Sequence, residues 1–510
     1  MQTPITERHN QQVYFDYHAL NPISAAAGHP YFGEVVYNNP GNRTLYNPNL
    51  TDLAPRVGFA YAVMPKLVFR GGWGLYYSRN MYGGGPNPGY SQSTNWTATV
   101  DGLTPSQPLV SAFSTGILPV TGNSLGSLTN VGQGGGGFNP HRPDPRVKQF
   151  VFGLQYAFTS NDLLDINYVG NRGTRILGSM NYGQLDPKYL AMGSALNNHV
   201  ANPFTSALTS LGLPAFSCQN GDGSVPQAQL LMPYPEFCGS VGPPSEPIGF
   251  SNYNSLQASF THRLSLGLTF TASYTYSKFL DDVGGPEEWG SINSGFGGIG
   301  SIRNYYNLAA EKGVDSTDIP QSLVLNYVYE LPIGRGKKIA GGMNSIEDAV
   351  VGGWQVSGVT HVTGGFPLGI GNGGANPASL WGGNQHATVP NGVNWKGGGC
   401  MVNNTLVPAG SKLCWFNATA PTQTPAYQFG NAPRYFSNLR SPGYVDEDLG
   451  IQKWFNIAEG FRLQFRAEMY NTFNHTNFDS PDVGIGDATF GRLTNTQGAR
   501  QVQVALRLVR

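Results

Sequence analysis

The 510-residue sequence has few charged side chains: Asp, Glu, Lys and Arg make up 12% of it, about half the share of ordinary soluble proteins. Its 30 basic and 30 acidic residues give a formal net charge of zero. Because proteins that bind nucleic acids carry a basic excess, this balance argues against a nucleic-acid partner. It argues equally against a substrate that is recognised by its negative charge.

Long apolar runs are also missing from the sequence. No stretch of about eighteen apolar residues occurs, which excludes a transmembrane helix. Membrane-spanning β-strands remain open, because only every second residue of such a strand must be apolar. The start of the chain lacks an apolar stretch as well, since Met1 is followed by Gln-Thr-Pro-Ile-Thr-Glu-Arg-His. We therefore expect no signal peptide in this chain.

The patterns that mark catalytic and metal sites are missing too. The nine His residues form no HExxH motif, the glycine run 134–137 is not followed by Lys-Ser/Thr, and no Gly-x-Ser-x-Gly occurs. Acidic residues gather in one long connection, at Asp281, Asp282, Glu287, Glu288, Asp315 and Asp318. Paired carboxylates suit a glycosidase or a Ca²⁺ site, but solvated loop charge is what we expect here. We expect no catalytic, cofactor-binding or metal-binding residue, no cofactor, and no enzymatic activity.

Cysteine is scarce, and the spacing of the four residues matches no metal-binding pattern. Cys218 and Cys238 lie in one stretch rich in Gly, Asn and Pro, and Cys400 and Cys414 lie in another. We predict that each pair forms a disulfide, which places the protein in an oxidising compartment. Four unpaired thiols are the alternative.

Strict alternation of apolar and polar residues is the most informative feature that the sequence does have. Residues 268–277 read Leu-Thr-Phe-Thr-Ala-Ser-Tyr-Thr-Tyr-Ser, so every residue between the apolar ones carries a hydroxyl. A strand points successive side chains to opposite faces, so this segment has one apolar and one polar face. A length of about ten residues suits a tilted strand that crosses a bilayer.

The same alternation predicts eleven strands. They cover residues 55–63, 67–77, 148–158, 163–170, 254–263, 268–278, 321–331, 354–363, 444–455, 461–472 and 500–509. Tight turns alternate with connections of tens of residues, at about 78–147, 171–253, 279–320 and 364–443, and a short helix is expected over 344–351. Short turns at one end and long loops at the other are typical of an outer-membrane β-barrel.

Eleven strands are an odd number, whereas a closed antiparallel bacterial barrel has an even one. At least one further strand is therefore expected, most naturally before residue 1, because residues 1–54 hold only weak candidates such as 11–17. The predicted fold is an all-β, antiparallel transmembrane barrel with long extracellular loops and short periplasmic turns.

Several phrases of the sequence carry a family resemblance. They are PRVGFAY at 55–61, FRGGWGLYY at 69–77, YVGNRGT at 168–174, LLMPYPEF at 230–237, YNSLQ at 253–257, ASYTYSK at 272–278, YELPIGRG at 329–336, LQFRAE at 463–468 and FNHTNF at 473–478. In this order they resemble the C-terminal barrel portion of the Oar-like TonB-dependent transporters, the group with an N-terminal carboxypeptidase-regulatory-like domain.

The resemblance implies how the chain is organised. The family has a plug domain inside a barrel of about 22 strands. This chain would be an incomplete part of such a barrel, with a partial strand remnant and loop at 1–54, the C-terminal part of the barrel at 55–510, and no plug domain. Its end departs from the family, because Leu508-Val509-Arg510 lacks the terminal aromatic residue that serves as a signal for barrel assembly.

The resemblance also implies a function. It suggests a receptor barrel in the cell outer membrane for uptake of a large or scarce solute, such as a carbohydrate or a siderophore. The implied partners are outer-membrane lipid, the barrel-assembly machinery, an unknown solute, and TonB through a missing N-terminal region. Two alternatives stay open: a plugless surface barrel or adhesin that binds glycans or cells through its long loops, and a soluble all-β lectin or enzyme.

Overall fold

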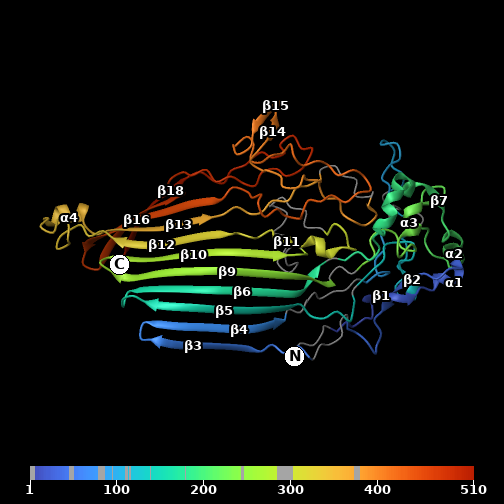
Figure 1. The fold of residues 1–510 in the computed structure, drawn as a ribbon, viewed down its shortest axis with the longest axis horizontal. Coiled ribbons are helices and arrows are strands. Elements are labelled where there is room, and N and C mark those ends of the chain that lie inside the picture. Colours follow the sequence, from blue (N-terminus) through green and yellow to red (C-terminus); the bar gives the residue numbers. More distant parts are fainter. Residues whose placement is uncertain are drawn as a thin grey trace.

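The computed structural model describes residues 6–44, 51–77, 87–94, 96–108, 113, 116–137, 139–178, 180–242, 246–283, 302–372 and 380–510. Its main feature is one antiparallel sheet in which eleven long strands follow one another in chain order (Figure 1). These strands are β3 (Arg56–Met64), β4 (Leu67–Tyr77), β5 (Arg146–Ala157), β6 (Asp162–Gly178), β9 (Glu246–Ser265), β10 (Leu268–Asp281), β12 (Gln321–Glu330), β13 (Trp354–Thr363), β16 (Tyr444–Ala458), β17 (Phe461–Tyr470) and β18 (Gln501–Val509). All eleven predicted strands are confirmed. A twelfth, the two-residue β11 (Gly313–Val314), pairs with the end of β10.

The short turns lie together at one end of this sheet, and the long connections lie at the other (Figure 1). Between β9 and β10 the turn residues Leu266 and Gly267 have φ values of 53° and 84°, as a two-residue turn of type I′ requires. The expected helix at the turn end is present as α4 (Ser345–Val351). The Asn344 side chain accepts from the amides of Ile346 and Glu347, and Glu347 accepts in return from the Asn344 amide.

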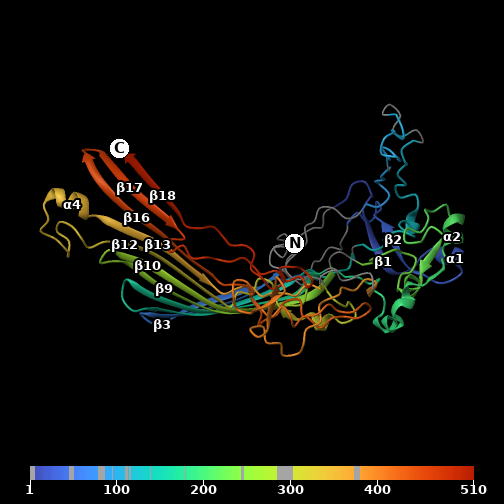
Figure 2. The same cartoon turned by 90° about the horizontal axis from the view of Figure 1, so that it is seen from above.

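The sheet is open. Its edges are β3 and β18, and neither has a second strand partner among the described residues. Seen from above, the sheet curves strongly from β3 to β18 (Figure 2). The fold is therefore the expected antiparallel barrel wall, without closure of its two edges.

The strand register sorts side chains onto two faces. On the first face, Phe270 pairs with Tyr327, and Tyr274 pairs with Leu323. We call this the apolar face. On the second, the polar face, Thr271 lies opposite both Asn326 and Thr261. The predicted alternation of β10 thus extends across its neighbours.

Among the residues that the structure describes, no protein layer covers the apolar face. Phe152 is 48% exposed, Leu256 47% and Leu506 68%, although all three are large apolar residues within strands. Every residue of β3 is exposed. Because burying an aliphatic or aromatic side chain of this size is worth about 1.5–3 kcal/mol, an uncovered wall of them requires an apolar surrounding.

The buried core of the protein lies instead in the long connections and residues 6–44, which together we call the loop layer. Its regular elements are β1 (Val13–Leu20), α1 (Ile23–Ala27), β2 (Phe32–Tyr37), η2 (Gly126–Leu128), η3 (Pro187–Asn197), β7 (His199–Ala201), α2 (Thr205–Ser210), β8 (Ser224–Pro226), α3 (Gln227–Leu231), η6 (Leu308–Glu311), β14 (Gly399–Val402) and β15 (Thr405–Pro408). Among the described helices, none is long and apolar enough to span a membrane.

Three hydrophobic clusters hold the loop layer together. The first joins the β1–β2 hairpin to α2 through Phe15, Val35 and Phe204, and the third packs η3 against Leu380 from a connection almost two hundred residues later. The second, around Phe416, gathers residues 368–439 and 483–490. The candidate strand at 11–17 is therefore a strand, but it pairs within the loop layer and not in the main sheet.

Two disulfides also lie in the loop layer. The structure joins Cys218 to Cys238 and Cys400 to Cys414, across 20 and 14 residues of sequence. Closing a loop of this length stabilises a folded segment by about 3 kcal/mol. Each bond therefore fixes a loop whose own secondary structure is short.

Glu236 is a carboxylate without a partner inside the first cluster. Its side chain is fully buried, and neither oxygen accepts a hydrogen bond within the described part of the chain. Burial raises the pKa of Glu236 from its ordinary value of 4.5 to about 8.

We expect the loop layer around Glu236 to lose stability as the pH rises. The folded state holds the proton more tightly than the unfolded chain, so the stabilising contribution is complete below about pH 4.5 and disappears by about pH 8. Within that window each pH unit removes at most ~1.4 kcal/mol, a factor of ten in local opening. Hydrogen exchange of residues 227–238, corrected for the intrinsic rate, measures this loss.

The Glu236→Gln variant is the matched control, because its side chain has nearly the same shape and does not titrate. Its protection should stay level where that of the wild-type protein falls. Equal losses in both proteins, or an equal loss in the distant Phe416 cluster, would assign the pH dependence to other groups.

Candidate functional site

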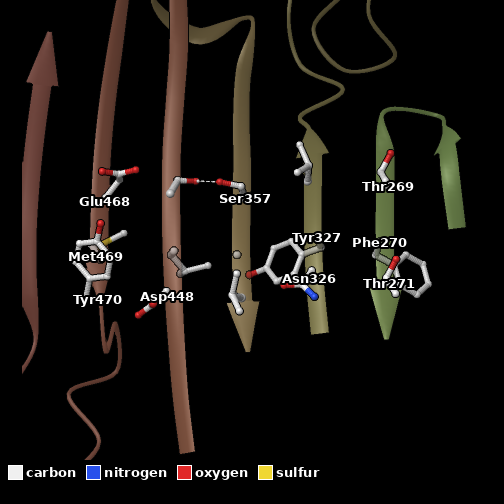
Figure 3. Close-up of a pocket in the computed structure, with 15 residues that line it drawn as sticks. Thr269, Phe270, Thr271, Asn326, Tyr327, Ser357, Asp448, Glu468, Met469 and Tyr470 are labelled. Carbon is white, nitrogen blue, oxygen red and sulfur yellow. Dashed lines mark hydrogen bonds between the residues drawn. The ribbon is translucent and has the colours of Figure 1, made fainter. Parts of the chain in front are cut away.

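Within the described part of the chain, three cavities lie on the polar face. The first, of about 550 Å³, lies over β3 to β9 and is lined by residues such as Arg56, Gln149 and Asn171. The second, of about 450 Å³, lies over β10 to β17, and its lining includes Asn326 and Glu468 (Figure 3). The third, of about 440 Å³, lies at the loop end of the sheet and shares two lining residues with the first. Cavities of about 300–1,000 Å³ are the size that holds small molecules.

Charged and amide side chains of the polar face pair with one another, both across neighbouring strands and along β17. Arg70 Nη2 lies 2.5 Å from Asp165 Oδ2, and Arg466 Nε lies 3.2 Å from Glu468 Oε1. The amide of Gln464 donates to Gln452, and Gln452 donates to Gln355. Gln464, Arg466 and Glu468 thus form a polar row opposite the apolar residues of β17. Such side chains suit a watery lumen and are costly against lipid.

The register also places charged residues on the apolar face, and two of them, Glu447 and Lys453, have partners that satisfy their charge. Glu447 accepts hydrogen bonds from the hydroxyls of Tyr327, at 2.9 Å, and Thr360. The Tyr327 ring reaches it across Gly358, where a Cβ would come within 2.5 Å of the ring. No local sequence pattern indicates this arrangement, because the three residues lie on three different strands.

Lys453 is the second of these two residues, and it is buried. Its ammonium donates to the carbonyls of Asp348 and Gly352, at the end of α4. A buried charge is tolerated only when such partners satisfy it. The helical connection between β12 and β13 therefore has a role in covering this lysine.

Three of the acidic residues predicted to be solvated loop charge, Asp281, Asp315 and Asp318, are instead buried, which corrects that expectation for them. Arg434 Nη2 lies 2.6 Å from Asp281 Oδ1, and Arg440 Nη2 lies 2.5 Å from Asp318 Oδ2. Asp315 is buried beside them, and Glu287 and Glu288 lie outside the described residues. Sequence reasoning missed these ion pairs because the arginines follow more than a hundred residues after the carboxylates.

The pairs of Arg434 with Asp281 and of Arg440 with Asp318 attach the loop layer to the loop end of the sheet, and a third ion pair lies beside them. Arg303 Nε lies 3.1 Å from Glu311 Oε1, and Arg434 also donates to the Glu311 carbonyl. Losing one partner of a buried ion pair destabilises a protein by about 3–5 kcal/mol, since the remaining charge is left unpaired. These pairs hold segment 302–320 in place between the strand ends and residues 429–442.

Two carboxylates near these pairs have raised pKa values. Burial, with a smaller effect of the charge on Asp281, raises the pKa of Asp282 to about 6. The Phe250 amide, which donates to Asp282, opposes this shift. Burial likewise raises the pKa of Asp315. Within the described ranges, no group of three or more His, Cys, Asp or Glu residues has a metal-binding arrangement.

The predicted site residues do not line these cavities. All four cysteines lie in the loop layer, and none belongs to the lining of the three cavities. The residues that do line the third cavity, such as Tyr253 and Thr275, were visible in the sequence only as members of alternating strands. Their common signal is the polar phase of that alternation.

Comparison with solved structures gives weak likenesses to outer-membrane proteins. The outer membrane transporter YddB from Escherichia coli has 10% identity and a TM-score of 0.39, over 94% of this chain and 42% of that one. The ferripyoverdine receptor of Pseudomonas aeruginosa has 10% identity and a TM-score of 0.37, over 94% and 35%. BauA, the ferric preacinetobactin receptor from Acinetobacter baumannii, has 10% identity and a TM-score of 0.36, over 93% and 38%.

The chain thus spans less than half the length of these structures, and likenesses at this level carry no argument about function. No curated protein matches the chain. The family model described as "Outer membrane beta barrel domain" matches residues 1–503, nearly the whole sequence. The uncovered apolar face is therefore the one that meets lipid, and the chain belongs to the outer membrane β-barrel domain family.

Proposed function

We propose that this chain is the barrel part of a receptor of the TonB-dependent type, which takes up a solute across the outer membrane. The observation that carries the proposal is the pairing of a bare apolar face with a polar face that holds three cavities under a folded loop layer. The phrases shared with the Oar-like group favour that subgroup. TonB would act through a region other than these strands.

The two faces divide the work of such a receptor. The apolar face provides contact with lipid, and the polar face provides hydroxyls, amides and paired charges along a water-filled lumen. The loop layer covers the outer end of that lumen. Because its clusters, disulfides and buried ion pairs hold it in one arrangement, it can select solutes by shape.

Loss of the gene from its own host tests this function. We expect energy-dependent uptake of one solute class to disappear from a panel of ferric siderophores, cobalamin and neutral oligosaccharides, and to return when the gene is restored. Uptake should also stop when a protonophore removes the energy source. Unchanged uptake of every solute, together with weaker attachment to cells or glycans, would support the adhesin alternative instead.

Ala272 and Ser273 test the assignment of the two faces. They are adjacent in β10, lie at nearly the same depth, and point to opposite faces. The natural cysteines are all in disulfides, so Ala272→Cys and Ser273→Cys each provide one thiol for a nitroxide label. We expect oxygen, which concentrates in lipid, to relax the label at 272 more strongly. A water-soluble nickel complex should instead relax the label at 273 more strongly than the label at 272.

The comparison has a clear contrary outcome. Stronger nickel relaxation at 272 than at 273 would mean that the apolar face meets water, and the lumen assignment would be wrong. Equal relaxation at both positions would mean that the sheet is not embedded in lipid.

A further inference from the structure

The third cavity is the best-defined compartment of the polar face. It lies where β6, β9, β10 and β12 meet segment 317–319 at the loop end of the sheet. Its lining consists of Asn171, Ser251, Tyr253, Thr275, Ser277, Phe279, Thr317, Asp318, Ile319 and Ser322. Four strands and one roof segment, which leads directly into β12, thus contribute.

The roof of this cavity is fixed in place. The Ser277 hydroxyl donates to the Ile319 carbonyl at 2.7 Å, and the Ser277 amide donates to the Pro320 carbonyl at 3.0 Å. Asp318 Oδ1 accepts from the Phe279 amide at 2.6 Å. Because the roof segment is already held in place, binding a ligand does not require the entropic cost of ordering it.

The cavity offers no free charge. Asp318 is the one ionisable carboxylate of its lining, and its second oxygen is bound to Arg440. Arg440 is in turn engaged by the carbonyls of Asp318 and Gly365. A charged ligand would leave water without gaining an opposite charge, which disfavours it.

Five further polar side chains of the lining are uncommitted, whereas the Thr317 hydroxyl donates to Asp315. Within the described part of the chain, the side chains of Asn171, Ser251, Thr275 and Ser322 form no hydrogen bond with other residues, and neither does the Tyr253 hydroxyl. Hydroxyls both donate and accept, and a carboxamide has separate donor and acceptor atoms. This set therefore matches a ligand that carries many neutral hydroxyls.

Two aromatic rings supply the apolar part of the lining. The centroids of Tyr253 and Phe279 lie 6.0 Å apart, with the ring planes at 85°. Sugar rings combine hydroxyl edges with apolar C–H faces, and aromatic rings provide large apolar faces of this kind. A charged, chelated metal complex has neither the neutrality nor this distribution of polar groups.

We propose that the third cavity binds a neutral carbohydrate, with Tyr253 and Phe279 against a sugar ring and the free hydroxyls and Asn171 around its edge. This inference names the solute class of the proposed uptake and so rests on that function. It differs from it in being a statement about binding, which is measurable without transport.

Calorimetric titration of the purified full chain in detergent tests the proposal. The probes are neutral trisaccharides of the α-glucan, β-glucan, xylan and galactan series, with a trisaccharide of uronic acids as the charged counterpart. We expect one neutral series to bind and the charged counterpart to fail. Heat-modifiable gel mobility checks that each variant is folded.

Matched serine variants locate the binding. Ser322→Ala and Ser251→Ala each remove one free hydroxyl and should raise Kd about two- to tenfold. Tyr253→Phe should act similarly, and Tyr253→Ala, which also removes the ring, should act more strongly. Ser273→Ala removes a hydroxyl from the same face outside the cavity and should leave Kd unchanged.

Two results would overturn the proposal: no binding of any neutral probe to the folded protein, or binding that these four variants do not weaken. The binding experiment and the uptake experiment test different claims, so their results can be told apart. Uptake of a ferric complex without sugar binding would remove this inference and keep the receptor function. Sugar binding that maps to the cavity, with uptake unaffected by loss of the gene, would keep the site and remove the function.

Discussion

The absence of water from the hydrocarbon layer is the constraint on which the rest of this structure depends. Backbone amides and carbonyls in lipid must be paired by the protein itself, and a meander of long antiparallel strands does this across the whole sheet. The same constraint makes every second side chain apolar. At two of the places where the chain departs from that rule, Glu447 and Lys453, partners on neighbouring strands or on α4 satisfy the charge.

The open edges follow from the same pairing. Eleven strands in an antiparallel meander leave β3 and β18 running in the same direction, so these two edges cannot pair antiparallel with each other. An odd number of further strands between them is needed for closure. Their backbone groups and the exposed apolar side chains of β18 are otherwise prone to unspecific association. The two edge strands are thus the part of the sheet whose backbone hydrogen bonds are least satisfied within the described chain.

The sequence predicts this sheet well and the loop layer poorly, for a physical reason. Strand alternation has a period of two and is local, so it located all eleven strands. The core around Phe416, the unpartnered Glu236 and the pair of Arg434 with Asp281 depend on contacts between segments far apart in the chain. Charges that were interpreted as solvated are buried for the same reason, because nothing near them in sequence indicates an arginine.

The candidate site shows where local patterns stop being informative. Thr275 and Ser277 are two hydroxyl residues of one strand, on one face, and the sequence treats them alike. In the structure the Ser277 hydroxyl donates to the Ile319 carbonyl and fixes the roof of the cavity. The Thr275 hydroxyl forms no hydrogen bond within the described part of the chain and lines the cavity. The difference arises only from the position of segment 317–319, which the pair of Arg440 with Asp318 sets. Binding capacity on this wall is therefore decided by the loop layer, through the hydroxyls that it leaves uncommitted.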